Sequence, residues 1–444
     1  MFERTRLNVT IQPGALSGEI EAPSSKSEAH RLLICAAFAP GTTDIDCTTT
    51  SQDIEATIGC LNALGARIAR TERGFRVRPV PGSAASDNLP APAQESLLDC
   101  GESGSTLRFL LPVVAALGCD ARLTGHGRLP ERPLSPLYEE LVSHGSELGP
   151  QGQMPLAVGG KLRAGRFSLP GNVSSQYVSG LLLAAPLLRA PVEVVVTEPV
   201  ESRPYIDLTI SALARFGVQV TETRVTDALG HPARAFVAEG ADGLSTPGHV
   251  SVGGDWSNAA FWLAAGALGN GPVAVSGVDV NSAQGDRQIL AALALLGARV
   301  VRGPEGAAAG PDHLAGRTID VSSCPDLVPP LAAVAAVAEG TTRITGAARL
   351  RIKESDRLAT VSAAINALGG HAEALDDGLV IQGGPLVGGT VDAANDHRIA
   401  MMAAVLATRA TGPTTIVGAE CVAKSYPAFF EDFQALDGRC SKEE

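Results

Sequence analysis

The sequence predicts an α/β protein made of six repeated helix-and-strand units, grouped as two sets of three. Apolar helical patterns that end in glycine and continue into a strand-like run recur along the whole chain. Their glycines, 69–80 residues apart, are Gly65, Gly145, Gly217, Gly297, Gly369 and Gly438. Glycine after the last helical turn is the usual left-handed C-cap. Units of this size exceed solenoid repeats of about 20–50 residues, so they indicate compact subdomains.

Composition is that of a folded chain with more than one domain. The 444 residues exceed one ordinary core, and 45% are hydrophobic while 18% are charged, which excludes a disordered chain. The net charge is −12, from 35 Lys and Arg against 47 Asp and Glu. An acidic chain is a poor non-specific binder of nucleic acid, so we expect no nucleic-acid partner. No apolar run is long enough to span a membrane, and we expect no membrane partner.

The cysteines and the N-terminus indicate a cytoplasmic protein. Eight cysteines are scattered without a C-x-x-C pair, which is typical of reduced thiols and not of a disulfide framework or a zinc site. The first six residues carry charges with no apolar run behind them, which argues against a secretory signal.

Glycine and proline mark the ends of short strands and of loops. Residues 192–196 and 271–275 have the composition of short strands bounded by these residues. Residues 80–95 and 303–311, rich in Gly, Ala and Pro, are predicted as surface loops. Neither loop is long enough to link two domains.

The N-terminal half carries polar clusters at the starts of apolar helices. Ser25-Lys26-Ser27 precedes one such helix, with Arg31 one turn after Ser27, and Gly101-Glu102-Ser103-Gly104 opens another. The free N–H groups of a helix start bind anions, and the two cations add charge. Serine caps with solvated charges explain each cluster equally well.

Three further segments of this half present hydrogen-bond donors. Arg128 and Arg132 lie in a proline-stiffened loop, where a guanidinium can hold a carboxylate or phosphate through two hydrogen bonds. Ser174-Ser175-Gln176 and Ser202-Arg203-Pro204-Tyr205 each lead into a helix. Hydroxyl and amide groups suit phosphate or polyol recognition, although helix capping alone explains them.

The C-terminal half has denser charge at its helix starts. Asp326 heads an almost wholly apolar helix, where a carboxylate is either an N-terminal cap or a desolvated base. Residues 353–357 follow a strand, and their charges indicate either a ligand site or a solvated helix face. Asp396-His397-Arg398 and Lys424 also stand at polar helix heads.

Taken together, the cations favour an anion-binding cleft. The Lys and Arg residues at loop-to-helix junctions are Lys26, Arg31, Arg132, Lys353, Arg357, Arg398 and Lys424. If these junctions converge, they form a cationic cleft between the two domains, suited to small substrates with several anionic groups. No zinc, dinucleotide or P-loop pattern accompanies them, so we expect chemistry without a metal or cofactor.

These motifs, in this order, resemble those of the 5-enolpyruvylshikimate-3-phosphate (EPSP) synthase family over essentially the whole chain. The matching stretches are Ser25-Lys26-Ser27 with Arg31, Gly104-Ser105, Glu131-Arg132-Pro133, Ser174-Ser175-Gln176, Ser202-Arg203-Pro204-Tyr205, Pro325-Asp326, Lys353-Glu354-Ser355-Asp356-Arg357, Asp396-His397-Arg398 and Ala423-Lys424.

The resemblance implies the enolpyruvyl transferase fold, an inverse α/β barrel type with two globular domains of three βαβαββ units each. It implies an N-terminal domain over residues 23–249 and a C-terminal domain formed by residues 1–22 and 250–444. The active site is then expected in the interdomain cleft, closed by domain movement when substrates bind. A monomer is expected.

The resemblance also implies the reaction. The family transfers the enolpyruvyl group of phosphoenolpyruvate to the 5-hydroxyl of shikimate 3-phosphate, on the shikimate pathway to chorismate and the aromatic amino acids. The hydroxyl adds to C2 while C3 is protonated, and the tetrahedral intermediate then loses phosphate. Glyphosate occupies the phosphoenolpyruvate subsite in this family.

Residue roles follow by resemblance. The residues expected to bind shikimate 3-phosphate are Lys26, Ser27, Arg31, Ser174, Ser175, Gln176, Ser202, Tyr205, Asp326 and Lys353. Those expected to bind phosphoenolpyruvate are Lys26, Gly104, Arg132, Gln176, Arg357, Arg398 and Lys424. The expected catalytic residues are Lys26, Asp326 as the base on the 5-hydroxyl and Glu354 as the acid towards C3. Opposite roles require the two carboxyl groups to have different pKa values.

Three positions depart from the family pattern. Ser24 stands where Gly is usual, Glu102 where Asn is usual in the phosphoenolpyruvate loop, and Arg349 where some members have Asn. Glu102 adds negative charge near an anion, so it bears on phosphoenolpyruvate affinity and on any effect of glyphosate.

Two alternatives compete with this hypothesis. One is the sister transferase that acts on UDP-N-acetylglucosamine, which carries Lys-Asn in its first motif and a reactive Cys in its phosphoenolpyruvate loop. This chain has Lys26-Ser27 and no Cys in residues 128–132. The other is a non-catalytic anion-binding relative, which requires the loss of Asp326, Glu354 or the cations, and all are present.

Overall fold

The computed structural model describes residues 6–82, 96–240 and 242–443. It divides into two compact units, here called the N-terminal unit (Ser24–Val252) and the C-terminal unit (Met1–Pro23 with Gly253–Glu444). Most of the loop predicted at 80–95 lies outside the described residues.

Each unit contains three four-stranded sheets, and all six sheets have the same strand pattern. In every sheet the first two strands in space are parallel, and the third is antiparallel to both of its neighbours. This common pattern is the structural form of the six sequence repeats, and it confirms the predicted α/β class.

The sheets of the N-terminal unit, in spatial order, are β14 (His249–Ser251), β3 (Thr43–Asp46), β5 (Gly74–Arg78) and β4 (Arg67–Thr71); β6 (Ser96–Asp99), β7 (Ala121–Thr124), β9 (Leu156–Gly160) and β8 (Ser146–Leu148); and β10 (Arg166–Pro170), β11 (Val192–Thr197), β13 (Pro232–Ala238) and β12 (Val220–Thr226).

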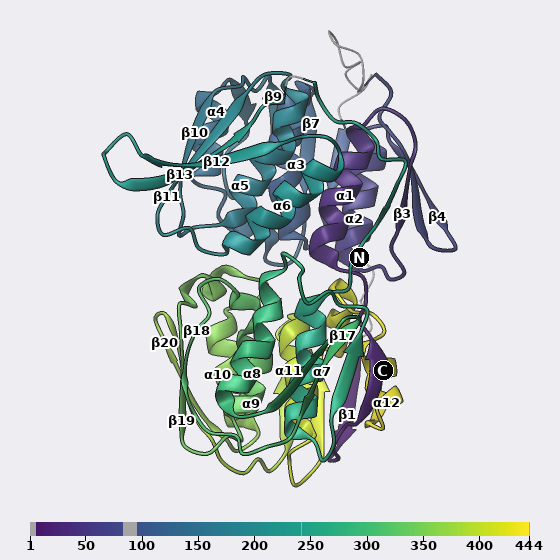
Figure 1. Ribbon diagram of the computed structural model, residues 1–444, viewed down its shortest axis with the longest axis vertical. Coiled ribbons are helices and arrows are strands. Elements are labelled where there is room, and N and C mark those ends of the chain that lie inside the picture. The colour runs from purple at the N-terminus through teal and green to yellow at the C-terminus, as the bar shows by residue number, and fades with distance from the viewer. Residues whose placement is uncertain (1–5, 83–95, 241, 444) are drawn as a thin grey trace. The chain divides into compact units, whose positions relative to one another are not determined.

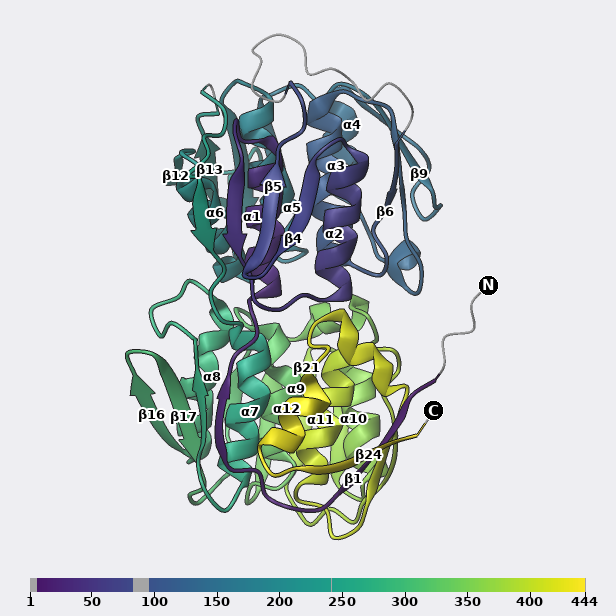
Figure 2. The same ribbon diagram turned by 90° about the vertical axis from the view of Figure 1, so that its right-hand side faces the viewer.

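The sheets of the C-terminal unit are β2 (Gly18–Glu21), β15 (Val273–Ser276), β17 (Gly306–Gly310) and β16 (Arg299–Gly303); β18 (Thr318–Asp320), β19 (Thr341–Thr345), β21 (Gly378–Gln382) and β20 (His371–Leu375); and β22 (Gly389–Asp392), β23 (Thr414–Val417), β1 (Asn8–Gln12) and β24 (Arg439–Glu443). Figure 2 shows β1, from the start of the chain, beside β24 at its end.

Helices fill the interior of each unit, and the sheets lie around them (Figure 1). The helices are α1 (Lys26–Phe38), α2 (Gln52–Ala63), α3 (Gly104–Leu117), α4 (Leu137–Ser143), α5 (Ser175–Ala184), α6 (Arg203–Arg215), α7 (Trp256–Leu268), α8 (Ile289–Leu296), α9 (Val328–Ala335), α10 (Arg357–Ala367), α11 (His397–Ala407) and α12 (Phe429–Ala435).

Short 3-10 helices precede or follow several of them. They are η1 (Leu129–Glu131), η2 (Ala185–Leu187), η3 (Gly285–Gln288), η4 (Pro325–Leu327), η5 (Ala348–Ile352) and η6 (Ala419–Lys424). Helix α11 is buried along its whole length, as expected of a helix that is apolar on all sides. Among the described residues, no helix combines the length and apolarity that a membrane crossing requires.

The predicted glycine C-caps are confirmed in five of the six units. Gly65, Gly145, Gly217, Gly297 and Gly369 all have positive φ. In the sixth unit the prediction was wrong, because Asp437 adopts the left-handed conformation (φ 67°) in place of Gly438. Gly438 is needed for a different reason, since a Cβ there would lie 2.3 Å from the Phe433 ring.

The loop predicted over 303–311 was also wrong. Residues 306–310 form β17, which pairs with β15 and β16. The small residues of β17 are explained by close packing against α7. The packing is tight, because a Cβ on Gly266 of α7 would lie 2.3 Å from the carbonyl oxygen of Ala309 in β17. Helix α7 therefore approaches this strand more closely than larger side chains allow.

We predict that Gly266→Ala destabilises the C-terminal unit by about 1–3 kcal/mol, because the added methyl overlaps β17. Urea unfolding followed by tryptophan fluorescence measures this, since both tryptophans, Trp256 and Trp262, lie in α7. The control is Gly59→Ala in α2, where no atom lies within 4 Å of the added methyl. That change is expected to stabilise its helix by roughly 0.5–1 kcal/mol, measured by circular dichroism. Equal effects of the two changes would contradict the packing argument.

Candidate active site

The helix starts of the N-terminal unit lie close together. Hydrogen bonds join side chains from the first two turns of five different helices, α1, α2, α3, α5 and α6. A helix start carries unpaired N–H groups and about half a positive charge. Gathering several starts therefore creates a region that attracts anions, and the predicted site residues of this unit lie on these starts or on the loop beside them.

The α1 motif is held by contacts to neighbouring helices. Lys26 is the first residue of α1, and its Nζ lies 2.9 Å from Oδ2 of Asp53 in the first turn of α2. Ser25 caps the helix by accepting from the N–H of Glu28. The capping explanation thus holds for Ser25, while Lys26 lies at the helix start next to Ser27 and is paired with Asp53.

Arg31 is almost completely buried and acts within the protein. Its guanidinium donates to the carbonyl oxygens of Ser27 (2.6 Å) and Tyr205 (2.9 Å). It also donates to the hydroxyl groups of Thr209 (2.7 Å) and Ser179 (3.3 Å). Arg31 therefore fixes the backbone of two predicted ligands, Ser27 and Tyr205, in addition to any contact of its own with a substrate.

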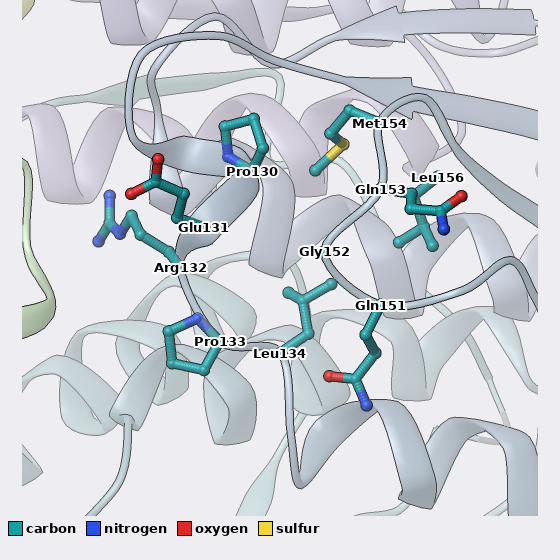
Figure 3. A pocket seen from close by; sticks show the side chains of 10 residues that line it. All are labelled: Pro130, Glu131, Arg132, Pro133, Leu134, Gln151, Gly152, Gln153, Met154 and Leu156. Carbon is teal, nitrogen blue, oxygen red and sulfur yellow. The ribbon is translucent and has the colours of Figure 1, made fainter.

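Gly104 and Arg132 are brought together at the start of α3. A Cβ on Gly104 would lie only 2.6–2.7 Å from the Arg132 guanidinium, so a larger residue here would displace that guanidinium. Arg132 follows η1 and lines a pocket of about 300 Å³ with residues 151–154. Figure 3 shows its side chain pointing away from Gln151 and Met154. A buried cation over a helix start is a strong anion-binding arrangement.

The loop that carries Arg132 is anchored to α3 and α5. Its Pro133 carbonyl oxygen accepts from Arg108 (3.1 Å) and from the Tyr177 hydroxyl (2.7 Å). Arg108 also donates to Oε1 of Gln176 at 2.8 Å. Arg108 was not predicted as a site residue, although a lone Arg in an apolar helix, one turn after Gly104, was a signal available in the sequence.

Ser174 and Ser202 directly precede the helices α5 and α6. Ser174 is the N-cap of α5 and accepts from the N–H of Gln176, so capping explains it. Ser175 follows as the first residue of the helix. Ser202 precedes α6 in the left-handed conformation (φ 51°) and makes no capping hydrogen bond with its side chain. Capping by the side chain therefore does not explain Ser202, and its left-handed backbone is of the kind that clusters at functional sites.

The C-terminal unit centres on one buried guanidinium. Arg357, the first residue of α10, donates to Asp396 (2.8 Å), Asp326 (2.8 Å) and Glu354 (2.6 Å). Asp396 is itself the N-cap of α11. One cation therefore joins the starts of α9, α10 and α11, and these contacts bring Arg357 together with both predicted catalytic carboxylates.

Asp326 is surrounded by cations. Its carboxylate lies 2.8 Å from Arg357, 3.3 Å from Arg398 and 3.7 Å from Lys353. Burial alone would raise the pKa of Asp326, but these three cations together hold it well below its ordinary value. Asp326 caps neither η4 nor α9 through its side chain, so the capping alternative is wrong.

The remaining predicted residues of this unit adjoin the same cluster. Arg398, the second residue of α11, also donates to the carbonyl oxygen of Asp326 at 3.2 Å. Lys424, at the end of η6, donates to the carbonyl oxygen of Asn395 at 2.6 Å. Asn395 directly precedes the α11 cap and has positive φ (54°). Lys424 is therefore bonded to the turn that leads into α11, the helix that carries Arg398.

Two acidic residues, one in each unit, were not predicted as site residues. Asp53 pairs with Lys26, and Asp286 of η3 is hydrogen-bonded to Ser257 at the start of α7. Burial and the neighbouring charge of Asp326 raise the pKa of Asp286 to about 6. Nothing in the local sequence distinguishes either residue, because each partner lies more than twenty residues away.

Glu102 and Arg349, two of the residues that differ from the family pattern, both have side chains that contact neighbouring backbone segments. The Glu102 carboxylate packs against Gly127, where a Cβ would lie 2.5 Å from it, and lies 3.7 Å from His126. Arg349 donates to the carbonyl oxygen of Ser322 at 2.7 Å. Arg349 thus holds the segment that leads into Asp326. In the described part of the chain, no group of three His, Cys, Asp or Glu side chains is placed to hold a metal ion.

Comparison with known proteins assigns the family. The family model for EPSP synthase (3-phosphoshikimate 1-carboxyvinyltransferase) matches residues 11–433. The chain belongs to the EPSP synthase family. As an EPSP synthase it is an enzyme, a transferase of the shikimate pathway of aromatic amino acid biosynthesis that transfers the enolpyruvyl group of phosphoenolpyruvate to shikimate 3-phosphate. The predictions of family, fold class and activity are therefore confirmed.

Relatives of this EPSP synthase span its full length. The 3-phosphoshikimate 1-carboxyvinyltransferase of Clostridium kluyveri is 42% identical over 97% of both chains, and that of Clostridium novyi is 38% identical. The structure of EPSP synthase from Acinetobacter baumannii matches with a TM-score of 0.78 at 29% identity, over 99% of this chain and all of that one. The enolpyruvyl transferase NikO from Streptomyces tendae, at 20% identity and a TM-score of 0.72 over 98% of this chain and 99% of that one, shares the fold.

We predict that Asp326→Asn destabilises the C-terminal unit at pH 7 by on the order of 2–4 kcal/mol, because it leaves cations without their carboxylate. A carboxyl whose folded pKa is lowered stabilises the fold above its unfolded pKa of about 3.9, and this contribution begins to fall there and is lost as the pH passes through the lower folded pKa. The deficit of the variant is therefore expected to shrink at about pH 3.5.

Urea unfolding by tryptophan fluorescence at both pH values measures this difference. The matched control is Asp376→Asn, at an exposed position of the same unit, which is expected to change stability by less than about 0.5 kcal/mol. A deficit for Asp326→Asn that is independent of pH would contradict the assignment of a low folded pKa.

Proposed function

We propose that the helix starts of the N-terminal unit bind shikimate 3-phosphate, with help from two residues of the other unit. The proposed ligands are Lys26, Ser27, Arg31, Ser174, Ser175, Gln176, Ser202, Tyr205, Asp326 and Lys353. The support is physical: hydroxyl, amide and backbone N–H donors at helix starts match the phosphate and hydroxyl groups of this substrate. Lys26, beside the start of α1, supplies the charge.

We further propose that cations of both units bind phosphoenolpyruvate. The proposed ligands are Lys26, Gly104, Arg132, Gln176, Arg357, Arg398 and Lys424. In the N-terminal unit, the Arg132 guanidinium over Gly104 supports this assignment. In the C-terminal unit, the support comes from the burial of Arg398 and Lys424 beside the α11 start. On this proposal, residues of both units act on the same pair of substrates.

Asp326 is proposed as the base that accepts the proton of the 5-hydroxyl. Its low pKa keeps it ionised but makes it a weak proton acceptor on its own. Two polyanionic substrates supply negative charge to the same cations, Arg398, Lys353 and Arg357. That charge offsets their effect and brings the pKa of Asp326 back towards its ordinary range. The base thus becomes competent when both substrates are bound.

Glu354 is proposed as the acid towards C3, and this role requires a change of partner. Its carboxylate is ion-paired with Arg357 at 2.6 Å, which favours the ionised form. When Arg357 turns to phosphoenolpyruvate, Glu354 loses that partner, and its largely buried position beside the anionic substrate then favours the protonated form. The proton then passes to C3 while the 5-hydroxyl loses its own proton to Asp326 and its oxygen bonds to C2. In the second step the C2–O bond to phosphate breaks and C3 returns a proton to Glu354, which restores the double bond.

The observation that carries the catalytic assignment is the contact of one guanidinium with Asp326 and Glu354 together. The test is phosphate release from phosphoenolpyruvate by the purified protein, with and without shikimate 3-phosphate, and with UDP-N-acetylglucosamine as a parallel acceptor. We expect release only with shikimate 3-phosphate, and a loss of about 10²-fold or more in Asp326→Ala. Release only with the nucleotide sugar, or full activity of Asp326→Ala, would refute the proposal.

Gly104→Ala tests the phosphoenolpyruvate site separately. Its methyl displaces the Arg132 guanidinium, so we expect KM for phosphoenolpyruvate to rise about tenfold. A tenfold rise corresponds to the loss of roughly one charge-assisted hydrogen bond. KM for shikimate 3-phosphate is expected to stay within about twofold. Gly59→Ala is the control, and a parallel rise of both KM values would count against the assignment.

We also propose that the enzyme is a cytoplasmic monomer. The support for the location is its cysteine usage, because seven of the eight cysteines are buried as thiols. Equilibrium sedimentation of the purified chain at its mass of 45.4 kDa tests the monomer, and a dimer mass would refute it.

A further inference from the structure

A buried row of side chains joins the α1 motif to the start of α3. Nδ1 of His30 lies 2.7 Å from the hydroxyl of Thr57 on α2, which lies 2.7 Å from the hydroxyl of Thr106 on α3. Thr106 Oγ1 in turn lies 2.8 Å from Oγ of Ser103, the N-cap of α3. His30, Thr57, Thr106 and Ser103 are all inaccessible to solvent.

The direction of these hydrogen bonds can be assigned. The ring of His30 is neutral, because burial, and then the charges of Lys26 and Arg31, lower its pKa well below the ordinary value. A neutral imidazole has one N–H. Nε2 is buried without a hydrogen-bond partner in the described part of the chain, so the proton belongs on Nδ1, where a partner stands.

Each hydroxyl has a single proton to donate, so the chain of bonds runs one way. His30 Nδ1–H donates to Thr57 and Thr57 donates to Thr106. Thr106 donates to Ser103 at 2.8 Å, which is much closer than its other acceptor, the carbonyl oxygen of Asp53 at 3.4 Å. Ser103 also accepts from the N–H of Thr106, which caps α3. Phe109 of α3 packs edge-on against the His30 ring, which holds the ring in this orientation.

We propose that His30 is a positioning residue for phosphoenolpyruvate, which acts through Thr57 and Thr106 on Ser103 and thereby sets the start of α3 at Gly104. His30 lies on α1 between Lys26 and Arg31, the residues proposed to bind shikimate 3-phosphate. It therefore ties the acceptor motif to the phosphoenolpyruvate loop. This inference rests on the proposed function of Gly104 and Arg132.

Three substitutions of His30 test the proposal. Asn and Gln place an N–H donor at different points, and Ala places none. The amide nitrogen of Asn occupies the place of Nδ1, whereas that of Gln reaches the place of Nε2. We expect His30→Asn to keep KM for phosphoenolpyruvate within about twofold, and His30→Gln and His30→Ala to raise it about tenfold. KM for shikimate 3-phosphate is expected to change by less than about threefold in all three variants.

A merely structural role makes a different prediction. In that case Asn and Gln behave alike, or both KM values move together with the thermal midpoint, and either result overturns the proposal. Thr57→Ser and Thr57→Val supply a second test in case a His30 variant fails to fold. Ser keeps the relaying hydroxyl and is expected to retain the KM for phosphoenolpyruvate, whereas Val removes it and is expected to raise that KM.

The wild-type measurement separates this inference from the proposed function. If the wild-type protein releases no phosphate with shikimate 3-phosphate, the proposed function itself fails. If it does, and Gly104→Ala raises KM for phosphoenolpyruvate while His30→Gln and Thr57→Val leave it unchanged, only the role of His30 is refuted.

Discussion

The C-terminal unit depends on the sharing of one buried cation among three carboxylates. Arg357 is inaccessible to solvent, and a lone charge there would be prohibitively costly. Asp326, Glu354 and Asp396 compensate it, and they in turn hold three helix starts together. Arg398 and Lys353 bring further positive charge to Asp326. The protein's own carboxylates therefore occupy the cations, and on the proposed function an anionic substrate has to compete with them.

The two units cap their helices with different chemistry. In the N-terminal unit the side-chain caps of α1, α2, α3 and α5 are neutral serines, which are Ser25, Ser51, Ser103 and Ser174. In the C-terminal unit the caps of α7, α10 and α11 are aspartates, which are Asp255, Asp356 and Asp396. Serine satisfies the N–H groups without cancelling the positive end of the helix, whereas aspartate cancels it. The starts of α3 and α5, which have no acidic residue in their first turns, thus stay attractive to anions, whereas α1 and α2 carry acidic residues there. In the C-terminal unit that task falls to side-chain cations.

Local patterns predicted the repeats and the positions of the site motifs, because glycine caps and polar helix heads are local features. They failed where packing decides, as at Asp437, which takes the left-handed turn one residue before Gly438, and at β17, whose small residues fit under α7. They also failed for long-range pairs. Arg357 meets Asp326 and Asp396 across 31 and 39 residues, and Arg108 meets Gln176 across 68. Only the tertiary packing of the helices that carry them brings these residues together.

The most direct test of this account is the number of protons taken up when phosphoenolpyruvate binds. Calorimetric titration in two buffers of different ionisation enthalpy, at about pH 7.5, measures it on enzyme saturated with an acceptor analogue that lacks the 5-hydroxyl. If Arg357 leaves Glu354 for the substrate, uptake of close to one proton is expected, and Glu354→Gln is expected to abolish it. Binding without proton uptake, or uptake that persists in Glu354→Gln, would contradict the exchange of partners on which the proposed acid depends.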